Sequence, residues 1–170
     1  FNVRVEYKLK AGGNSGDYIP VPEDGTHQGD GAGIEVQVLD DAADRYRTLK
    51  PYQYTGSLYA ISPATKHVAR EAGQWNLLEI NCRGMKYHVF HNGTLILSAD
   101  ETTFPELKGR LTKGHLGLQN HSEEVWFRNL RIGPALDLPV EPAEPAKLGA
   151  STIEEVLKKP ILEASTSQRE

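Results

Sequence analysis

The chain has 170 residues, enough for one domain with a buried core followed by a tail. Its 19 Lys and Arg against 23 Asp and Glu give a net charge of -4, so nucleic acid has no basic surface to bind. No apolar run approaches the roughly 18 residues that a membrane-spanning helix requires. The 16 Gly and 10 Pro favour an all-β chain with many turns, and the lone Cys82 excludes an intramolecular disulfide.

The first ten residues alternate between apolar and polar side chains, which predicts a half-buried strand. Residues 11–16 form a glycine-rich turn. A second strand follows near 18–21, where Pro20 requires a sheet edge or a bulge because it has no N–H to donate.

The most informative strand spans residues 33–39. Ile34, Val36 and Val38 face one side of it, which leaves Glu35 and Gln37 together on the other. A polar patch on one face of a sheet is therefore expected here.

Other strands are expected at 56–61, 75–82, 85–91, 94–99, 114–119 and 125–132. Asn92-Gly93 predicts a hairpin, and Arg83-Gly84 predicts a tight turn. In the last strand the apolar positions change phase after Phe127, which predicts a bulge near Arg128-Asn129. The alternation as a whole predicts an antiparallel β-sandwich over residues 1–133.

After Gly133 the composition shifts to Pro, Ala and Glu, which predicts a linker over 134–150. A short helix and tail follow over 151–170, with Ser151 or Thr152 as the cap and Pro160 as the stop. We expect its apolar residues to dock on the sandwich, on another subunit of a homo-oligomer or on a missing domain.

Several short motifs occur in order along the first 133 residues. They are Gly13-Asn14-Ser15-Gly16, Gly33 to Asp40, Tyr54 to Tyr59, Gly73-Gln74-Trp75-Asn76, Asn92-Gly93, Gly117 to His121 and Phe127 to Leu130. Together they resemble the 3-keto-disaccharide hydrolase domain family.

The resemblance implies a two-sheet antiparallel jelly-roll of the concanavalin A-like kind, related to legume lectins and glucanases. It also implies a carbohydrate partner, a sugar oxidised to a ketone at C3, and a periplasmic or secreted bacterial protein. Two features depart from the family. Pro20 stands where members usually carry Arg, and members usually have further strands before Phe1, so this chain is a fragment or completes its sheet by other means.

A 3-keto group acidifies the hydrogen on C2, so cleavage by hydrolysis, or by elimination then hydration, needs a base near C2, an acid near the leaving oxygen and a donor for the enolate. Glu35 is the candidate base, since an apolar setting raises a carboxyl pKa; the alternative is a solvated surface carboxylate. Asp40 and His121 are the other catalytic candidates, although Asp often caps a turn and a loop His is often structural.

Five residues are candidates for binding the sugar: Asn14, Gln37, Tyr59, Gln119 and Arg128. For Asn14 the alternative is to organise its glycine turn, and for Tyr59 it is packing. For Arg128 it is a salt bridge to a neighbouring strand. A divalent cation held by Glu35, Asp40 or His121 would suit the enolate, but no recognised ligand motif is present.

Two classes of function remain open. The first is an enzyme that cleaves 3-keto-glycosides, which requires Glu35, Gln37, Asp40 and His121 to converge in one cleft. The second is a non-catalytic module that binds carbohydrate or serves structure and assembly in a larger surface protein.

Overall fold

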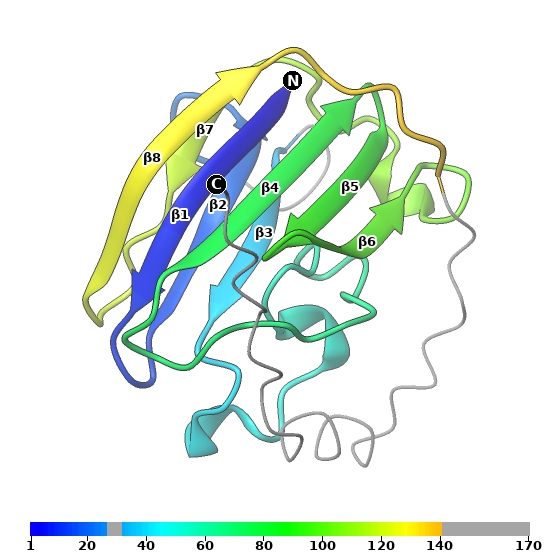
Figure 1. Ribbon diagram of the computed structural model, residues 1–170. Coiled ribbons are helices and arrows are strands. Elements are labelled where there is room, and N and C mark those ends of the chain that lie inside the picture. The colour runs from blue at the N-terminus through cyan, green and yellow to red at the C-terminus, as the bar shows by residue number, and fades with distance from the viewer. Residues whose placement is uncertain (27–31, 141–170) are drawn as a thin grey trace, which may run out of the picture.

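The computed structural model describes residues 1–26 and 32–140, so the helix expected after residue 150 lies outside the described residues. The described chain is mostly β, in two antiparallel sheets (Figure 1). One sheet has five strands in the order β6-β5-β4-β1-β8, and the other has three in the order β3-β2-β7. The two-sheet antiparallel fold predicted from the sequence is thus confirmed.

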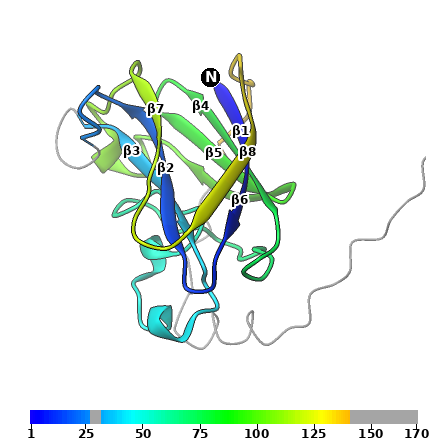
Figure 2. The same ribbon diagram turned by 90° about the vertical axis from the view of Figure 1, so that its left-hand side faces the viewer.

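The strands are β1 (Asn2–Leu9), β2 (Asn14–Val21), β3 (Ile34–Leu39), β4 (Asn76–Arg83), β5 (Lys86–His91), β6 (Thr94–Ala99), β7 (His115–Leu118) and β8 (Val125–Gly133). Short 3-10 helices lie at Asp44–Tyr46, Pro51–Gln53 and Pro105–Leu107. Seen from the side, the two sheets stack face to face (Figure 2). Within the described part of the chain, no helix is long and apolar enough to cross a membrane.

The core lies between the sheets and follows the alternation of the sequence. Val5 and Tyr7 of β1 face inward from the larger sheet, and Val36 and Val38 of β3 face inward from the smaller one; all four are at most 1% exposed. Side chains of opposite parity therefore point away from the core on both sheets.

Three local irregularities occur where the sequence predicts them. Asn92 and Gly93 have φ of 48° and 80°, as a two-residue hairpin turn needs. The pairing of β1 with β8 shifts register between Arg4 and Glu6, directly after Arg128 in β8, and Asn129 has φ of 54°. The pairing of β2 with β7 shifts between Tyr18 and Val21, so Pro20 lies at a bulge and not in a regular ladder.

Two predicted boundaries are wrong. Residues 56–61 form no strand; only Leu58 makes single bridges, to Val36 and Ser62, because Gly56 and Ala60 have positive φ and turn the chain away. The second strand begins at Asn14, so Gly16 belongs to a strand and not to the preceding turn.

Residues 134–140, the start of the predicted linker, cross the outer face of the larger sheet. Asn81 of β4 exchanges two hydrogen bonds with the backbone of Leu136, at 2.7 and 3.0 Å. His88 of β5 contacts the Pro139 carbonyl at 2.9 Å, and Arg83 pairs with Asp137. These contacts bury Asn81 and His88 to 0% and 2% exposure, and we call residues 134–140 the strap.

The sandwich is open on one side. β7 and β8 are edge strands of the two sheets and lie on the same side of the molecule (Figure 2). Their core-facing residues Leu118, Leu130 and Ile132 are 44%, 54% and 64% exposed, because no described strand covers them.

Candidate functional site

Polar side chains gather on the outer face of the three-stranded sheet. In the register, Glu35 is opposite Tyr18 and Gln37 is opposite Gly16. Val36 between them is buried in the core, so these side chains point outward. We define the polar face as Asn14, Tyr18, Glu35, Gln37, Tyr59 and Gln119.

Glu35 lies flat across β2 because residue 16 has no side chain. A Cβ added at Gly16 would lie 2.5 Å from Glu35 Oε1 and 2.9 Å from its Cγ. Glu35 is 5% exposed, and desolvation by burial raises its pKa to about 7. A carboxyl group with this pKa can accept and release a proton near neutral pH.

Tyr18 leans in the same direction, from β2 over β7. A Cβ at Gly117 would lie 3.2 Å from its ring, so a second glycine makes room for it. The Gln119 side-chain amide donates a 2.8 Å hydrogen bond to the Tyr18 hydroxyl. Burial, and then the negative charge of Glu35, raise the pKa of Tyr18, which keeps this hydroxyl protonated at neutral pH.

Gln37 orients Asn14. Its Nε2 donates to Asn14 Oδ1 at 2.8 Å and to the Ser15 carbonyl at 3.0 Å. Since the side-chain oxygen of Asn14 faces Gln37, its side-chain nitrogen, Nδ2, faces the other way and is a donor at the edge of the polar face.

Tyr59 completes the face beside β3. Its backbone N–H donates to the Glu35 carbonyl at 2.9 Å, and its hydroxyl accepts from Gln53 Nε2 at 3.1 Å. Because Leu58 is buried in the core, Tyr59 lies on the same side as Glu35.

Of the other two catalytic candidates, Asp40 lies apart from Glu35 and His121 lies in a loop. Asp40 is five residues further along an extended chain, about 16 Å away, and its carboxylate accepts the Gly12 N–H at 2.7 Å. His121 is exposed in the loop between β7 and β8. The structure thus brings Glu35 and Gln37 together and holds Asp40 apart from them, while His121 lies exposed two residues after Gln119.

Arg128 lies on the outer face of the larger sheet, away from the polar face. Its Nε binds Glu6 at 2.7 Å, and its guanidinium stacks on Trp75 at 3.9 Å from the ring centroid. Lys8 lies 4.5 Å from the centroid of Trp126 in the same cluster. The structure therefore shows the salt bridge to a neighbouring strand that the sequence left as the alternative role for Arg128.

The residues proposed to hold a divalent cation do not form a set of ligands. Asp40 lies apart from Glu35, as described above. Among the described residues, no three His, Cys, Asp or Glu side chains are grouped so that they could hold a metal ion.

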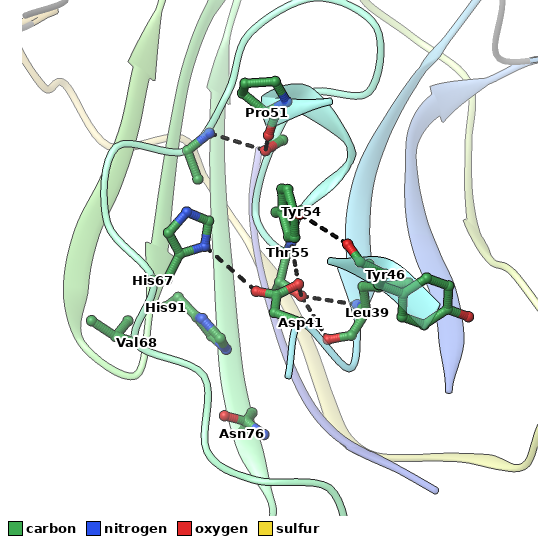
Figure 3. A network of polar contacts seen from close by, with 12 residues as sticks. Leu39, Asp41, Tyr46, Pro51, Tyr54, Thr55, His67, Val68, Asn76 and His91 are labelled. Atoms are coloured by element: carbon green, nitrogen blue, oxygen red, sulfur yellow. Dashed lines mark hydrogen bonds and ion pairs between the residues drawn. The ribbon is translucent and has the colours of Figure 1, made fainter. Parts of the chain in front are cut away.

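A second polar network, missed in the sequence, lies inside one end of the sandwich (Figure 3). Asp41 Oδ1 accepts from the Thr55 N–H and hydroxyl, both at 3.0 Å, and its Oδ2 is 3.5 Å from His67 Nδ1. Nearby, the Tyr7 hydroxyl contacts His91 Nε2 at 2.9 Å, and burial lowers the pKa of His91 to about 4. These contacts join loops to the core. The one sign of them in the sequence is that His91 shares the inward-facing alternate positions of its strand with apolar residues.

A shallow hollow of about 510 Å³ adjoins the polar face between β7 and β8. Gln119 belongs to both, and Leu118, Val125 and Phe127 supply apolar lining. The polar face and this hollow together offer hydrogen-bonding groups beside an apolar surface, as a sugar requires.

Known proteins resemble this chain in sequence and in fold. The profile of the 3-keto-alpha-glucoside-1,2-lyase-like domain family matches residues 1–133. A 3-keto-disaccharide hydrolase from Bacteroides thetaiotaomicron is 28% identical over 168 residues, with 78% of this chain and 57% of the relative covered. The chain thus spans a little over half the length of that relative.

Solved structures share the fold. A provisionally named glycosyl hydrolase from Parabacteroides distasonis is 25% identical with a TM-score of 0.68, covering 76% of this chain and 75% of that one. The carbohydrate-binding module CBM66 from Bacillus subtilis is 14% identical with a TM-score of 0.52, covering 76% and 72%, and so matches in fold alone.

Proposed function

Because the chain belongs to the 3-keto-alpha-glucoside-1,2-lyase-like domain family, as its motifs suggested, we propose that its polar face cleaves 3-keto-glycosides with Glu35 as the general base. Membership indicates a function related to carbohydrate. The finer assignment of substrate and reaction is our proposal, as are export to the periplasm or medium and the activity of the longer protein.

The reaction proceeds through an enolate. The Glu35 carboxylate takes the proton from C2, and the C–H electron pair forms a C2–C3 double bond as the C3 ketone becomes an enolate oxygen. An electron pair on the enolate oxygen then re-forms the C3 ketone, the C2–C3 π pair moves to form a C1–C2 double bond, and the C1–oxygen bond breaks with its pair staying on the leaving oxygen. The leaving alkoxide takes a proton, and addition of water across C1–C2 gives net hydrolysis.

One observation carries the proposal: Glu35 is a carboxyl group buried on a polar face whose pKa is raised to about 7. The hydrogen on C2 is a weak acid, so a carboxylate of ordinary pKa would remove it slowly, whereas a raised pKa makes a stronger base that is still half ionised at neutral pH. In this proposal Asn14 and Tyr59 bind hydroxyl groups of the sugar; the hydrogen bonds from Gln37 to Asn14 and from Gln53 to the Tyr59 hydroxyl support these roles.

The test is turnover of 3-keto-trehalose by Glu35→Gln. We expect its turnover to fall by about 10²–10⁴-fold, since amide and carboxyl have the same shape but the amide cannot take a proton. The wild-type rate should rise with pH through about 7, because Glu35 must be ionised. Glu79→Gln, on the opposite sheet and bound to Arg4, is the matched control and should retain full activity.

Heavy water distinguishes the two routes. Elimination and hydration in D₂O place deuterium at C2 of the released sugar, whereas direct hydrolysis leaves the original hydrogen. Full activity of Glu35→Gln would remove Glu35 from the catalytic role.

A non-catalytic carbohydrate-binding module is the second candidate. It is favoured by the separation of Asp40 from Glu35, which leaves one carboxyl group among the residues that define the polar face. Saturable binding of 3-keto-trehalose by the wild-type chain without release of glucose would establish this alternative.

A further inference from the structure

The enolate of the proposed reaction needs a hydrogen-bond donor at its oxygen, and the residues defining the polar face include no Lys or Arg. We propose that the Tyr18 hydroxyl is this donor and holds the oxygen on C3, with Gln119 as its positioning residue. This inference rests on the proposed function.

Tyr18 is the donor on the side to which Glu35 points. The two residues are opposite one another in the β2–β3 register, and the Glu35 side chain extends over Gly16 onto β2. Tyr59 lies beside the other edge of β3, where its backbone N–H donates to the Glu35 carbonyl. Asn14 is four residues from Tyr18 along β2, about 13 Å away. C2 and C3 are adjacent atoms, so a base and a donor on neighbouring strands match them.

The hydroxyl is held in place from both ends of the side chain. The ring lies over Gly117, where any larger residue would meet it, and Gln119 donates its amide N–H to the phenolic oxygen at 2.8 Å. Gln119 is itself fixed, because its backbone N–H donates to the Gly16 carbonyl and its own carbonyl accepts from the Ser15 hydroxyl at 2.6 Å. With its oxygen accepting from Gln119, the hydroxyl directs its proton away from Gln119.

The Tyr18 hydroxyl is a neutral donor, and its hydrogen bond to the oxygen on C3 strengthens as negative charge develops on that oxygen. The ketone oxygen of the bound sugar is a weak acceptor and the enolate oxygen a strong one, so the hydrogen bond lowers the barrier more than it tightens binding. No proton needs to leave Tyr18 in this step. Removal of the hydroxyl should therefore reduce the rate and leave KM nearly unchanged.

The experiment separates enolate formation from cleavage with 3-keto-1,5-anhydroglucitol, which has no leaving group at C1. Exchange of its C2 hydrogen in D₂O, followed by NMR, reports only the step that Glu35 and Tyr18 share. We expect Tyr18→Phe to slow this exchange and the turnover of 3-keto-trehalose by about 100-fold. Gln119→Leu should give a smaller loss in both assays, again without a change in KM.

Tyr46→Phe is the matched control, since the Tyr46 hydroxyl donates to the Gly12 carbonyl away from the polar face; it should exchange at the wild-type rate. Wild-type exchange by a folded Tyr18→Phe, or a loss confined to KM, would overturn this inference and leave the proposed function standing. Absence of both exchange and cleavage in the wild-type protein would overturn the proposed function, and this inference with it.

Discussion

At the scale of single residues, the candidate site depends on the absence of a side chain at position 16. Gly16 has an ordinary extended backbone, so its role is space and not conformation: it lets the Glu35 side chain lie across the neighbouring strand. The atoms that a Cβ would meet belong to a flexible side chain, so the backbone can remain where it is while the carboxyl group moves.

We therefore expect Gly16→Ala to lower turnover by about 10-fold or more through displacement of Glu35, with a small change in melting temperature. Gly133→Ala is the control, because a Cβ there meets nothing within 4 Å. Measured by kinetics and thermal unfolding, an active Gly16→Ala enzyme would show that the position of Glu35 over β2 is not required.

Some residues of the site could be predicted from the sequence and others could not. Glu35 and Gln37 interrupt an apolar run at alternate positions, and this pattern alone places them together on the outer face. Tyr18 carries no such signal, because an aromatic residue in a short strand before Pro20 is equally typical of a core. Asp40 and His121 illustrate the converse, since chemistry suggested them but a turn holds Asp40 apart from Glu35 and His121 lies in an exposed loop.

At the scale of elements, periodicity predicted most strands because each sheet buries one face. The phase change after Phe127 even located a bulge, since one extra residue reverses the parity of a strand. The failure at 56–61 has the opposite cause: side-chain alternation says nothing about the positive φ of Gly56 and Ala60, which breaks the pairing after one bridge.

The contacts of the strap indicate that the folded unit extends beyond residue 133. Composition places the end of the domain at residue 133, yet Asn81 and His88 are buried beneath residues 134–140 and use them as hydrogen-bond partners. A chain that ends at Gly133 would expose these polar groups to water and lose the net contribution of each hydrogen bond, on the order of 0.5–1.5 kcal/mol.

We expect a chain that ends at Val140 to unfold at a higher temperature than one that ends at Gly133, by several degrees. Asn81→Ala in the longer chain should reproduce part of the loss, because it removes both bonds to Leu136. Equal melting temperatures for the two chains would place the boundary at 133, as composition alone predicts.

At the scale of the whole molecule, the interior contains a carboxyl group that makes its stability depend on pH. Asp17 faces the core beside Val36 and Leu118, both its oxygens are buried, and neither has a hydrogen-bond partner among the described residues. Burial raises its pKa from 3.8 to about 7. The folded protein therefore retains this proton up to about pH 7, whereas the unfolded chain releases it near pH 4.

The contribution of Asp17 to the free energy of unfolding should therefore fall as the pH rises from about 4 to 7, and it should stay at this lower value above pH 7. Asp17→Asn carries no charge at either pH. We therefore expect its stability relative to the wild type to be higher at pH 8 than at pH 5, by on the order of 2–4 kcal/mol. Urea unfolding of both proteins at the two pH values measures this difference.

The lowered pKa of His91 acts in the opposite direction, since it costs stability as the pH falls from about 6.5 to 4. That contribution is present in both proteins and cancels in the comparison. An Asp17→Asn effect of the same size at pH 5 and pH 8 would show that Asp17 is already ionised in the folded state.

The cation-bearing cluster on the back of the larger sheet has a practical consequence for work on this protein. Trp75 and Trp126 are its two tryptophans, and both rest against the amino and guanidinium groups of β1 and β8, on the far side from Glu35. Their fluorescence therefore monitors whether the edge strand β8 is attached to β1. Trp126 also lines the hollow between β7 and β8. A sugar bound over Glu35 alone should therefore leave tryptophan emission unchanged, whereas a sugar that reaches the hollow should alter it, and calorimetry or NMR would detect binding in both cases.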